Sequence, residues 1–249
     1  MISRPFPSRT SLEMANYSDV DTLTTVTLDL VRRIETLLSR QASNPGQRML
    51  IALAGVPGSG KSTISNALLT ELASRGIQDA AVVPMDGFHY TREVLSSFED
   101  PKLAFKRRGA PFTFDAEGCV KLVKLLKSTP VTVGGEDNLC ITAPSFDHAL
   151  KDPVEEGIRI SSRTRLVIIE GNYTLLRQSP WEQIAEICDE RWFVDAPPEK
   201  VQDRLVQRHL AAGIETSMPA AIARAQENDM PNGELIRSLL VKPDVVIQN

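Results

Sequence analysis

The sequence predicts an α/β fold with three layers, in which a mostly parallel five-stranded sheet is covered by helices on both faces. From residue 48 onward, short apolar runs alternate with segments of helical periodicity, and this alternation is typical of strand–helix–strand units. The apolar runs are rich in β-branched residues and lack alternating polar positions. Such runs are expected of parallel strands that are buried on both faces.

The individual elements follow from the same patterns. The predicted strands span residues 49–54, 81–85, 166–170, 191–195 and 244–247. The predicted helices span residues 61–75, 115–127, 181–188, 198–212 and 218–229. Two longer segments, 87–113 and 129–162, do not fit the alternation. Insertions of that length on an α/β core are usually binding loops or lids, so we expect them to face a substrate.

The first 47 residues are expected to form a tail and one helix that precede a single domain, residues 48–249. Arg4, Arg9 and several serines resemble an organelle-targeting segment only weakly, and a simple tail is the plainer expectation. Apolar residues recur at helical spacing between residues 23 and 38. A helix capped by Asp21 or Thr22 is therefore predicted, and it should pack on the sheet.

Composition narrows the class of protein. Of the 249 residues 42% are hydrophobic and 24% charged, so the chain can bury a sizeable core. A net charge of −4 argues against binding to nucleic acid or a membrane surface, and no apolar run is long enough to span a bilayer. Cys119, Cys140 and Cys188 are widely spaced without a metal-binding pattern, which favours a reducing, cytoplasmic setting. The oligomeric state stays open between monomer and homodimer.

A phosphate-binding loop lies between the first predicted strand and the helix that follows it. The predicted nucleotide-binding residues are Gly55, Val56, Pro57, Gly58, Ser59, Gly60, Lys61, Ser62 and Thr63, and they match the pattern GxxxxGK[ST]. The glycines let successive N–H groups point inward, and the helix dipole adds positive charge. Lys61 should lie between the β- and γ-phosphates, and the Ser62 hydroxyl is a suitable ligand for Mg²⁺. The sequence therefore predicts binding of a nucleoside triphosphate, with ATP and Mg²⁺ as cofactors.

Two carboxylates end predicted strands. Glu170 ends the strand at 166–170, so it should lie beside the phosphate loop and hold Mg²⁺ together with Ser62. Asp86 directly follows the strand at 81–85 and should face the γ-phosphate as a general base for an attacking hydroxyl. The alternative for each is an ordinary turn residue. An Asn-Lys-x-Asp guanine reader is absent, which argues against a switch GTPase.

Further short motifs follow the loop in a fixed order. They are Asp-Gly-Phe-His-Tyr at 86–90, Arg-Gly-Ala-Pro at 108–111, Thr-Phe-Asp at 113–115, Pro-Ser-Phe-Asp-His at 144–148, Glu-Gly-Asn-Tyr at 170–173 and Arg-His-Leu at 208–210. Together they resemble the phosphoribulokinase/uridine kinase family, near its pantothenate-kinase-like and fructose-transport-kinase-like branches, over residues 48–249. The resemblance implies a P-loop NTPase α/β/α fold with a lid helix and substrate-binding insertions.

The resemblance also implies roles for individual residues. By this resemblance, Asp86 occupies the position of the family's catalytic base. Glu170 occupies the position of an acid that helps to hold Mg²⁺. The segment that holds Arg204 and Arg208 resembles the lid helix, whose arginines act with Lys61 on the phosphates. Both arginines should lie on one helical face because they are four residues apart. A solvated basic surface is the alternative.

Contacts to the acceptor are likewise implied by resemblance. The residues at the corresponding positions are His89, Tyr90, Arg107, Arg108, Phe114, Asp115, Phe146, Asp147 and His148. The first loop departs from the Asp-Ser-Phe-Tyr form of uridine kinases, so the acceptor stays open among nucleosides, sugars, sugar phosphates and pantothenate-like alcohols. Asp115 could instead cap the helix that follows it. Residues 228–232 resemble a border of the adenine site, although ordinary loop chemistry explains them equally well.

The sequence thus predicts an ATP- and Mg²⁺-dependent kinase that phosphorylates a hydroxyl group of a small metabolite. A nucleoside-triphosphate hydrolase without an acceptor is the main alternative, and a non-catalytic ATP-binding regulator is a third. The regulator is disfavoured by the set of Lys61, Ser62, Asp86 and Glu170, because a protein that only binds ATP has no need for a carboxylate facing the γ-phosphate.

Overall fold

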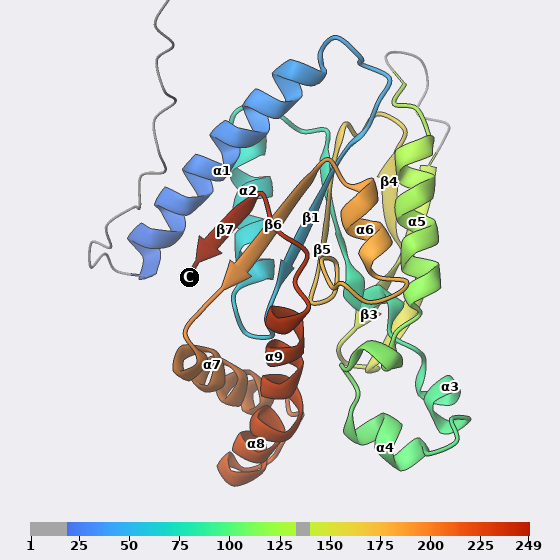
Figure 1. Cartoon of the computed structure of the whole chain (residues 1–249), viewed down its shortest axis with the longest axis vertical. Helices are drawn as coiled ribbons and strands as arrows, with labels where there is room; N and C mark the ends of the chain where they lie inside the picture. Colours follow the sequence, from blue (N-terminus) through green and yellow to red (C-terminus); the bar gives the residue numbers. More distant parts are fainter. Residues whose placement is uncertain (1–18, 133–139) are drawn as a thin grey trace, which may run out of the picture.

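The central sheet has five strands, all parallel, in a computed structural model that describes residues 19–132 and 140–249 (Figure 1). The strands are β1 (Met49–Gly55), β2 (Ala80–Pro84), β5 (Leu166–Gly171), β6 (Glu190–Asp195) and β7 (Val245–Gln248). Their order is β2-β5-β1-β6-β7, and each neighbouring pair is parallel. The predicted five-stranded sheet is confirmed, with strand ends that differ by one residue at most.

Helices cover both faces of this sheet. They are α1 (Asp19–Gln41) and α2 (Lys61–Ser74) on one face, and α5 (Ala116–Ser128) and α6 (Glu182–Ile187) on the other (Figure 1). Along β1, Ile51 and Leu53 join the apolar cluster under α1 and α2, whereas Leu50 and Ala52 join the cluster under α5 and α6. Because successive side chains of a strand point to opposite faces, a strand with no polar position is buried on both, which confirms the three-layer prediction.

Further helices gather at the carboxyl ends of the strands (Figure 1). They are α7 (Pro198–Ala211), α8 (Met218–Arg224), the π-helical turn η3 (Ala225–Asp229) and α9 (Met230–Ser238). The predicted helix at 218–229 is therefore only the first part of a longer helical run. Residues 228–232, for which loop chemistry was the alternative, are helical, and Pro231 fits because proline is tolerated in the first turn of a helix. The π-turn connects α8 to α9 without a break in the helix.

The two predicted insertions have structure of their own. The first holds the 3₁₀ turns η1 (Met85–Phe88) and η2 (Pro111–Thr113) and the short helices α3 (Arg92–Ser96) and α4 (Pro101–Lys106). The second forms an antiparallel hairpin of β3 (Cys140–Asp147) and β4 (Asp152–Ser161), which was not predicted. Pro144 and a register shift between Ala143 and Ser145 interrupt the alternation by which a strand would be recognised. A Cβ at Gly87 would overlap the Pro144 carbonyl group, so glycine allows the hairpin to pack on η1.

Helix α1 packs on the sheet as predicted. Leu30, Val31, Ile34 and Leu38 are buried with apolar residues of α2 and of the strands. The predicted helix start is wrong, because α1 already begins at Asp19 and the residues proposed as its cap, Asp21 and Thr22, lie in its first turn. The proposed targeting segment with Arg4 and Arg9 falls outside the described residues.

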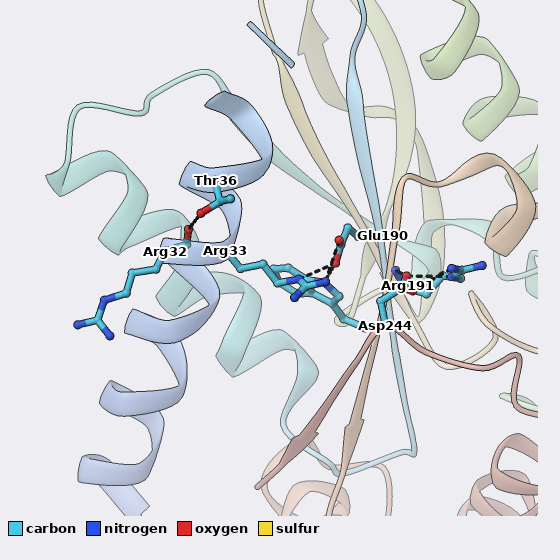
Figure 2. A network of polar contacts seen from close by, with 7 residues as sticks. Arg32, Arg33, Thr36, Glu190, Arg191 and Asp244 are labelled. Carbon is cyan, nitrogen blue, oxygen red and sulfur yellow. Dashed lines mark hydrogen bonds and ion pairs between the residues drawn. The ribbon is translucent and has the colours of Figure 1, made fainter. Parts of the chain in front are cut away.

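An ion pair fastens α1 to the start of β6 (Figure 2). The Arg33 guanidinium donates two hydrogen bonds to the Glu190 carboxylate, at 2.7 and 2.9 Å. The indole N–H of Trp192 donates a third, at 2.9 Å, to the same carboxylate, whose side chain is only 10% exposed. Next to it, Arg191 pairs with Asp244, which joins β6 to the start of β7. Bidentate geometry and partial burial make the Arg33–Glu190 pair stronger than an ordinary surface ion pair.

Replacing Glu190 with Gln should lower the free energy of unfolding by about 1–3 kcal/mol, because charge-assisted hydrogen bonds are lost at a half-buried site. Denaturant titration measures this change. The matched control is Asp29→Asn, which removes the exposed pair between Arg32 and Asp29 and should cost less than about 0.5 kcal/mol. If the free energy of unfolding decreased by the same amount in the two variants, the anchoring role of Glu190 would be contradicted.

The three cysteines are free thiols, with Cys119 and Cys188 buried and Cys140 exposed. Among the described helices, none combines the length and the apolar character that crossing a bilayer requires. Within residues 19–132 and 140–249, His, Cys, Asp and Glu side chains form no cluster of three or more that could hold a metal ion.

Candidate functional site

The phosphate loop connects β1 to α2 and leaves backbone N–H groups open. Gly60 caps α2 with a φ of +94°, a left-handed conformation that favours glycine, and no side chain caps the helix. The first N–H groups of α2 therefore have no side-chain acceptor, and an anion can take that place. Ser59 N donates to the Val56 carbonyl oxygen at 3.1 Å, which closes the turn.

Lys61 is buried at the bottom of the loop. Its ammonium group donates to the Val56 carbonyl oxygen at 3.1 Å and to the Asn172 side-chain oxygen at 2.8 Å. Burial lowers the pKa of Lys61 to about 8, and the carboxylates of Glu170 and Asp86 oppose that shift. Asn172 was not among the predicted site residues. Its position two residues after Glu170, at the carboxyl end of β5, is the signal that could have identified it.

Ser62 and Glu170 are joined across the site. The Ser62 hydroxyl donates to the Glu170 carboxylate at 3.1 Å. Burial raises the pKa of Glu170, whereas the charge of Lys61 and the hydrogen bond from Ser62 oppose this shift. A buried carboxylate and a hydroxyl side by side are hard oxygen donors, the kind that Mg²⁺ prefers.

Asp86 lies at the same edge of the sheet, on the 3₁₀ turn that directly follows β2. Pro84 pairs with Glu170 in the β2–β5 register, so Asp86 is two residues beyond the level of Glu170. Its negative charge contributes to the pKa values of both Lys61 and Glu170, so the three groups lie close together. The Asp86 side chain is exposed and makes no hydrogen bond or ion pair with the part of the chain that the structure describes.

A cavity of about 630 Å³ opens over the loop, within the range of small-molecule sites. Its lining comprises Leu23, Thr24, Gly58, Gly60, Lys61, Ser62, Thr63, Arg204, Arg208 and Asn249. The other predicted loop residues, Gly55, Val56, Pro57 and Ser59, are buried beneath it. Helix α1 thus contributes to the wall of the cavity, although the sequence placed it outside the domain that binds nucleotide.

Helix α7 brings both predicted arginines to this cavity. A guanidinium nitrogen of Arg204 lies 3.5 Å from the Gly58 carbonyl oxygen, and the charge of Arg208 contributes to the lowered pKa of Lys61, behind burial as its main cause. Leu205, between them in sequence, is fully buried and would contact a Cβ at Gly58. The packing of Leu205 on the loop therefore holds the two cations above the phosphate-binding turn.

Asn249 lines the cavity without having been predicted. Its side-chain N–H donates to the Ser59 carbonyl oxygen at 2.7 Å, and its backbone N–H donates to the Asp195 carbonyl oxygen at 3.0 Å. It lies directly after β7, and no motif in the sequence marks it.

On the other side of Asp86, three predicted acceptor residues form an aromatic cluster. The His89 ring stacks on Phe114 at a centroid distance of 3.9 Å and lies 5.1 Å from Phe146. Burial lowers the pKa of His89 to about 4, against the opposing charge of Asp86, so the imidazole is neutral at pH 7. His148 is exposed and contacts the edge of Phe146 at 5.3 Å.

Arg108 holds the hairpin against the turn at residues 107–109. Its guanidinium donates to the carbonyl oxygens of Lys151 at 2.6 Å and Tyr90 at 2.9 Å, and to the Asp152 carboxylate at 3.1 Å. It also lies over the Phe146 ring, 5.6 Å from its centroid. Arg108 was predicted to contact the acceptor, but in the structure its guanidinium binds groups of the protein itself.

Three other predicted acceptor residues have local partners. Asp115 caps α5 by accepting from Gly118 N at 2.9 Å, which is the alternative that the sequence left open. Asp147 accepts from the backbone N–H groups of Ala149 and Leu150 at 2.8 and 3.0 Å, and so forms the hairpin turn. Tyr90 packs edge-on against Phe98.

Residues 228–232 lie against the turn that carries Arg107 and Arg108. Asn228 donates to the Arg108 carbonyl oxygen at 3.0 Å, and Arg107 donates to the Asn232 side-chain oxygen at 3.4 Å. None of residues 228–232 is part of the lining of the cavity over the phosphate loop. The border with adenine stays a prediction, and the contacts that the structure shows for Asn228 and Asn232 are with the turn of the acceptor loop.

A family model and several relatives match the chain. The model described as methylmalonyl Co-A mutase-associated GTPase MeaB matches residues 23–89, which hold most of α1, the phosphate loop and Asp86. A uridine kinase-like protein of Schizosaccharomyces pombe is 38% identical over 221 residues, which are 88% of this chain and 89% of that protein. The ATP-dependent kinase YFH7 of Zygosaccharomyces rouxii is 33% identical over 223 residues, 81% of this chain but only 58% of the length of that kinase.

A solved structure matches nearly the whole described chain. It is that of a fructose transport system kinase-like protein from Silicibacter, with a TM-score of 0.73 and 35% identity. The match covers 87% of this chain and 98% of that chain. The similarity thus extends beyond the phosphate loop to the insertions and to α7–α9.

Proposed function

Because the chain belongs to the uridine kinase-like family of P-loop kinases, whose members are phosphotransferases, we propose that it transfers the γ-phosphate of ATP to a hydroxyl group of a small metabolite in the presence of Mg²⁺. Asp86 acts as the general base in this proposal. The finer assignments, namely the base, the metal ligands and the acceptor contacts, are proposed from the geometry of the site.

The observation that carries the proposal is the position of Asp86. Its exposed carboxylate lies beside Lys61 and Glu170 and also beside His89. From there it can take the proton of an attacking hydroxyl group as the new phosphorus–oxygen bond forms and the bond to the β-phosphate breaks. A hydroxyl held between Asp86 and the aromatic cluster would then have the orientation needed for attack.

The phosphates would be held by charges already in place. Lys61, Arg204 and Arg208 surround the loop, and the N–H groups of α2 add their dipoles. Because α7 already packs on the loop through Leu205, it can exclude water from the transferred phosphoryl group. Leu23, Thr24 and Asn249 line the same cavity and would border the base and ribose.

The residues present fit a magnesium ion. Ser62 and Glu170 supply two adjacent hard oxygens, and Mg²⁺ bound with nucleotide needs only one or two protein ligands besides phosphate and water. When bound, the ion neutralises charge on the β- and γ-phosphates. Glu170 is held for that role by its burial and by its bond to Ser62.

A hydrolase without an acceptor is the second candidate. It is favoured by one observation: Arg108, Asp115 and Asp147 are engaged within the protein and leave fewer groups for an acceptor. ATP labelled on its γ-phosphate separates the two candidates in a panel of nucleosides, sugars, sugar phosphates and hydroxy acids. A kinase yields labelled organic phosphate with at least one of them. Labelled inorganic phosphate released at one constant rate across the panel would instead establish a hydrolase.

ATP binding should weaken at alkaline pH because of Lys61. Burial lowers the pKa of this group to about 8 in the nucleotide-free protein, and only its protonated form attracts phosphate. Raising the pH from 7 to 9 should therefore increase the Kd for MgATP about tenfold, since binding must restore the lost proton. Calorimetric titration across this range checks the trend. Lys61→Met should remove the pH dependence, and an unchanged slope in that variant would assign it to another group.

A further inference from the structure

Two adjacent arginines in the acceptor loop have different environments. Arg108 is engaged by two carbonyl oxygens, the Asp152 carboxylate and the Phe146 ring. Arg107 is half-buried, and its one hydrogen bond with another described side chain, to Asn232, is long at 3.4 Å. The Nε atoms of both arginines are buried without a hydrogen-bond partner. The difference lies in the counter-ion, because Arg108 pairs with Asp152 whereas no carboxylate of the described residues lies within 4 Å of the Arg107 guanidinium.

Arg107 and Asp86 share a neighbour, the buried Tyr173, because the charges of both act on its phenol. The buried phenol of Tyr173 donates to the Gly109 carbonyl oxygen at 2.5 Å, which fixes the turn that carries Arg107. Burial raises the pKa of Tyr173, and the charges of Asp229, Arg107 and Asp86 act on it as well. The guanidinium of Arg107 and the carboxylate of Asp86 are thus close to the same phenol.

The negative charges nearby do not pair with Arg107. The Asp229 carboxylate is bonded to His209 at 2.8 Å, and the Asp86 carboxylate is exposed beside Lys61 and Glu170. A partly buried cation without a paired anion costs free energy, and an arginine fork is suited to the two oxygens of a carboxylate or phosphate. An anionic ligand would supply the missing partner.

We propose that the acceptor is an alcohol that carries an anionic group, a carboxylate or a phosphate, and that Arg107 binds this group while Asp86 faces the hydroxyl. This inference depends on the proposed kinase function and narrows its substrate class. Neutral nucleosides and free sugars leave the guanidinium of Arg107 without a counter-ion and are therefore poor acceptors.

The test compares neutral alcohols with two anionic series, hydroxy acids and sugar monophosphates, so that the two sources of the anion are distinguished. The variants are Arg107→Gln, Arg107→Lys and the control Arg40→Gln, an exposed arginine of α1. Wild-type protein should phosphorylate members of one anionic series. Arg107→Gln should raise the KM for that acceptor about 10- to 100-fold and leave the KM for ATP unchanged. Arg107→Lys should recover part of the loss, and Arg40→Gln should behave as wild type.

Binding gives a second readout that does not need turnover. With Mg²⁺ and a non-hydrolysable ATP analogue, the same anionic alcohols should raise the Tm of wild-type protein but not that of Arg107→Gln. Equal use of neutral and anionic alcohols, or an unchanged acceptor KM in Arg107→Gln, would overturn the inference while the kinase function stands. If no alcohol is phosphorylated and none shifts the Tm, both proposals fail. A melting curve of each variant without ligand confirms that it is folded.

Discussion

Replacing Asp86 with Asn should lower the rate of phosphoryl transfer by a factor of about 10²–10⁴, the usual contribution of a general base. The amide cannot accept the proton of the attacking hydroxyl group, whereas its size and shape are nearly those of the carboxylate. The Asp86 side chain is exposed and makes no hydrogen bond with the described residues, so the substitution should leave folding intact. The Kd for MgATP should stay within about threefold of the wild-type value, because the phosphate loop is unchanged.

The measurement is single-turnover transfer at saturating ATP, with ATP binding followed separately. Asp29→Asn is the matched control, since its carboxylate forms only an exposed pair with Arg32 on α1. Full activity in Asp86→Asn would exclude this carboxylate as the base. Loss of ATP binding together with activity would instead indicate that Asp86 acts on the nucleotide or its metal ion.

Replacing Lys61 with Met should lower kcat/KM for ATP on the order of 10³-fold, because a cation is removed from a site with little water. The ammonium group is buried between the Val56 carbonyl oxygen and Asn172 and is aimed at the phosphate-binding turn. Its removal also leaves Glu170 without its nearest cation, so part of the loss should come from weaker MgATP binding. Steady-state kinetics and calorimetry separate the two contributions.

Lys121→Met is the control for this variant, since Lys121 is exposed on α5. It should have wild-type kinetics. If kcat/KM for ATP fell less than tenfold in Lys61→Met, the arginines of α7 and the helix dipole would hold the phosphates without Lys61.

Much of the nucleotide side was predictable because its residues are close in sequence or lie at strand ends. The phosphate loop is one continuous segment, and its conformation follows from glycine and from the start of α2. Glu170 and Asp86 are far apart in the chain, yet Glu170 lies near the carboxyl end of β5 and Asp86 just beyond that of β2, and both strands are parallel. The β2–β5 register then brings them to one edge of the sheet. Parallel pairing alone was sufficient to predict that the two carboxylates lie at the same edge of the sheet.

The acceptor side was less predictable because its contacts join distant segments. Arg107 and Arg108 are identical in type and adjacent, but one is engaged by Asp152 and the other reaches Asn232. Neither partner shares a periodic pattern with the arginines, and the hairpin that carries Asp152 is interrupted by Pro144. The contribution of Leu23 to the cavity over the phosphate loop likewise depends on how α1 is fastened to β6 by Arg33 and Glu190.

By itself, the sequence determined that this chain folds as a parallel α/β sheet with a phosphate loop and two carboxylates at the edge where that loop lies. These features follow from local backbone preferences and from the hydrophobic pattern, which act over a few residues at a time. The tertiary structure decided which of two neighbouring arginines has no carboxylate partner among the described residues, and which helix and which residue after β7 complete the cavity over the phosphate loop. Such choices depend on side chains that meet only after the whole chain has packed.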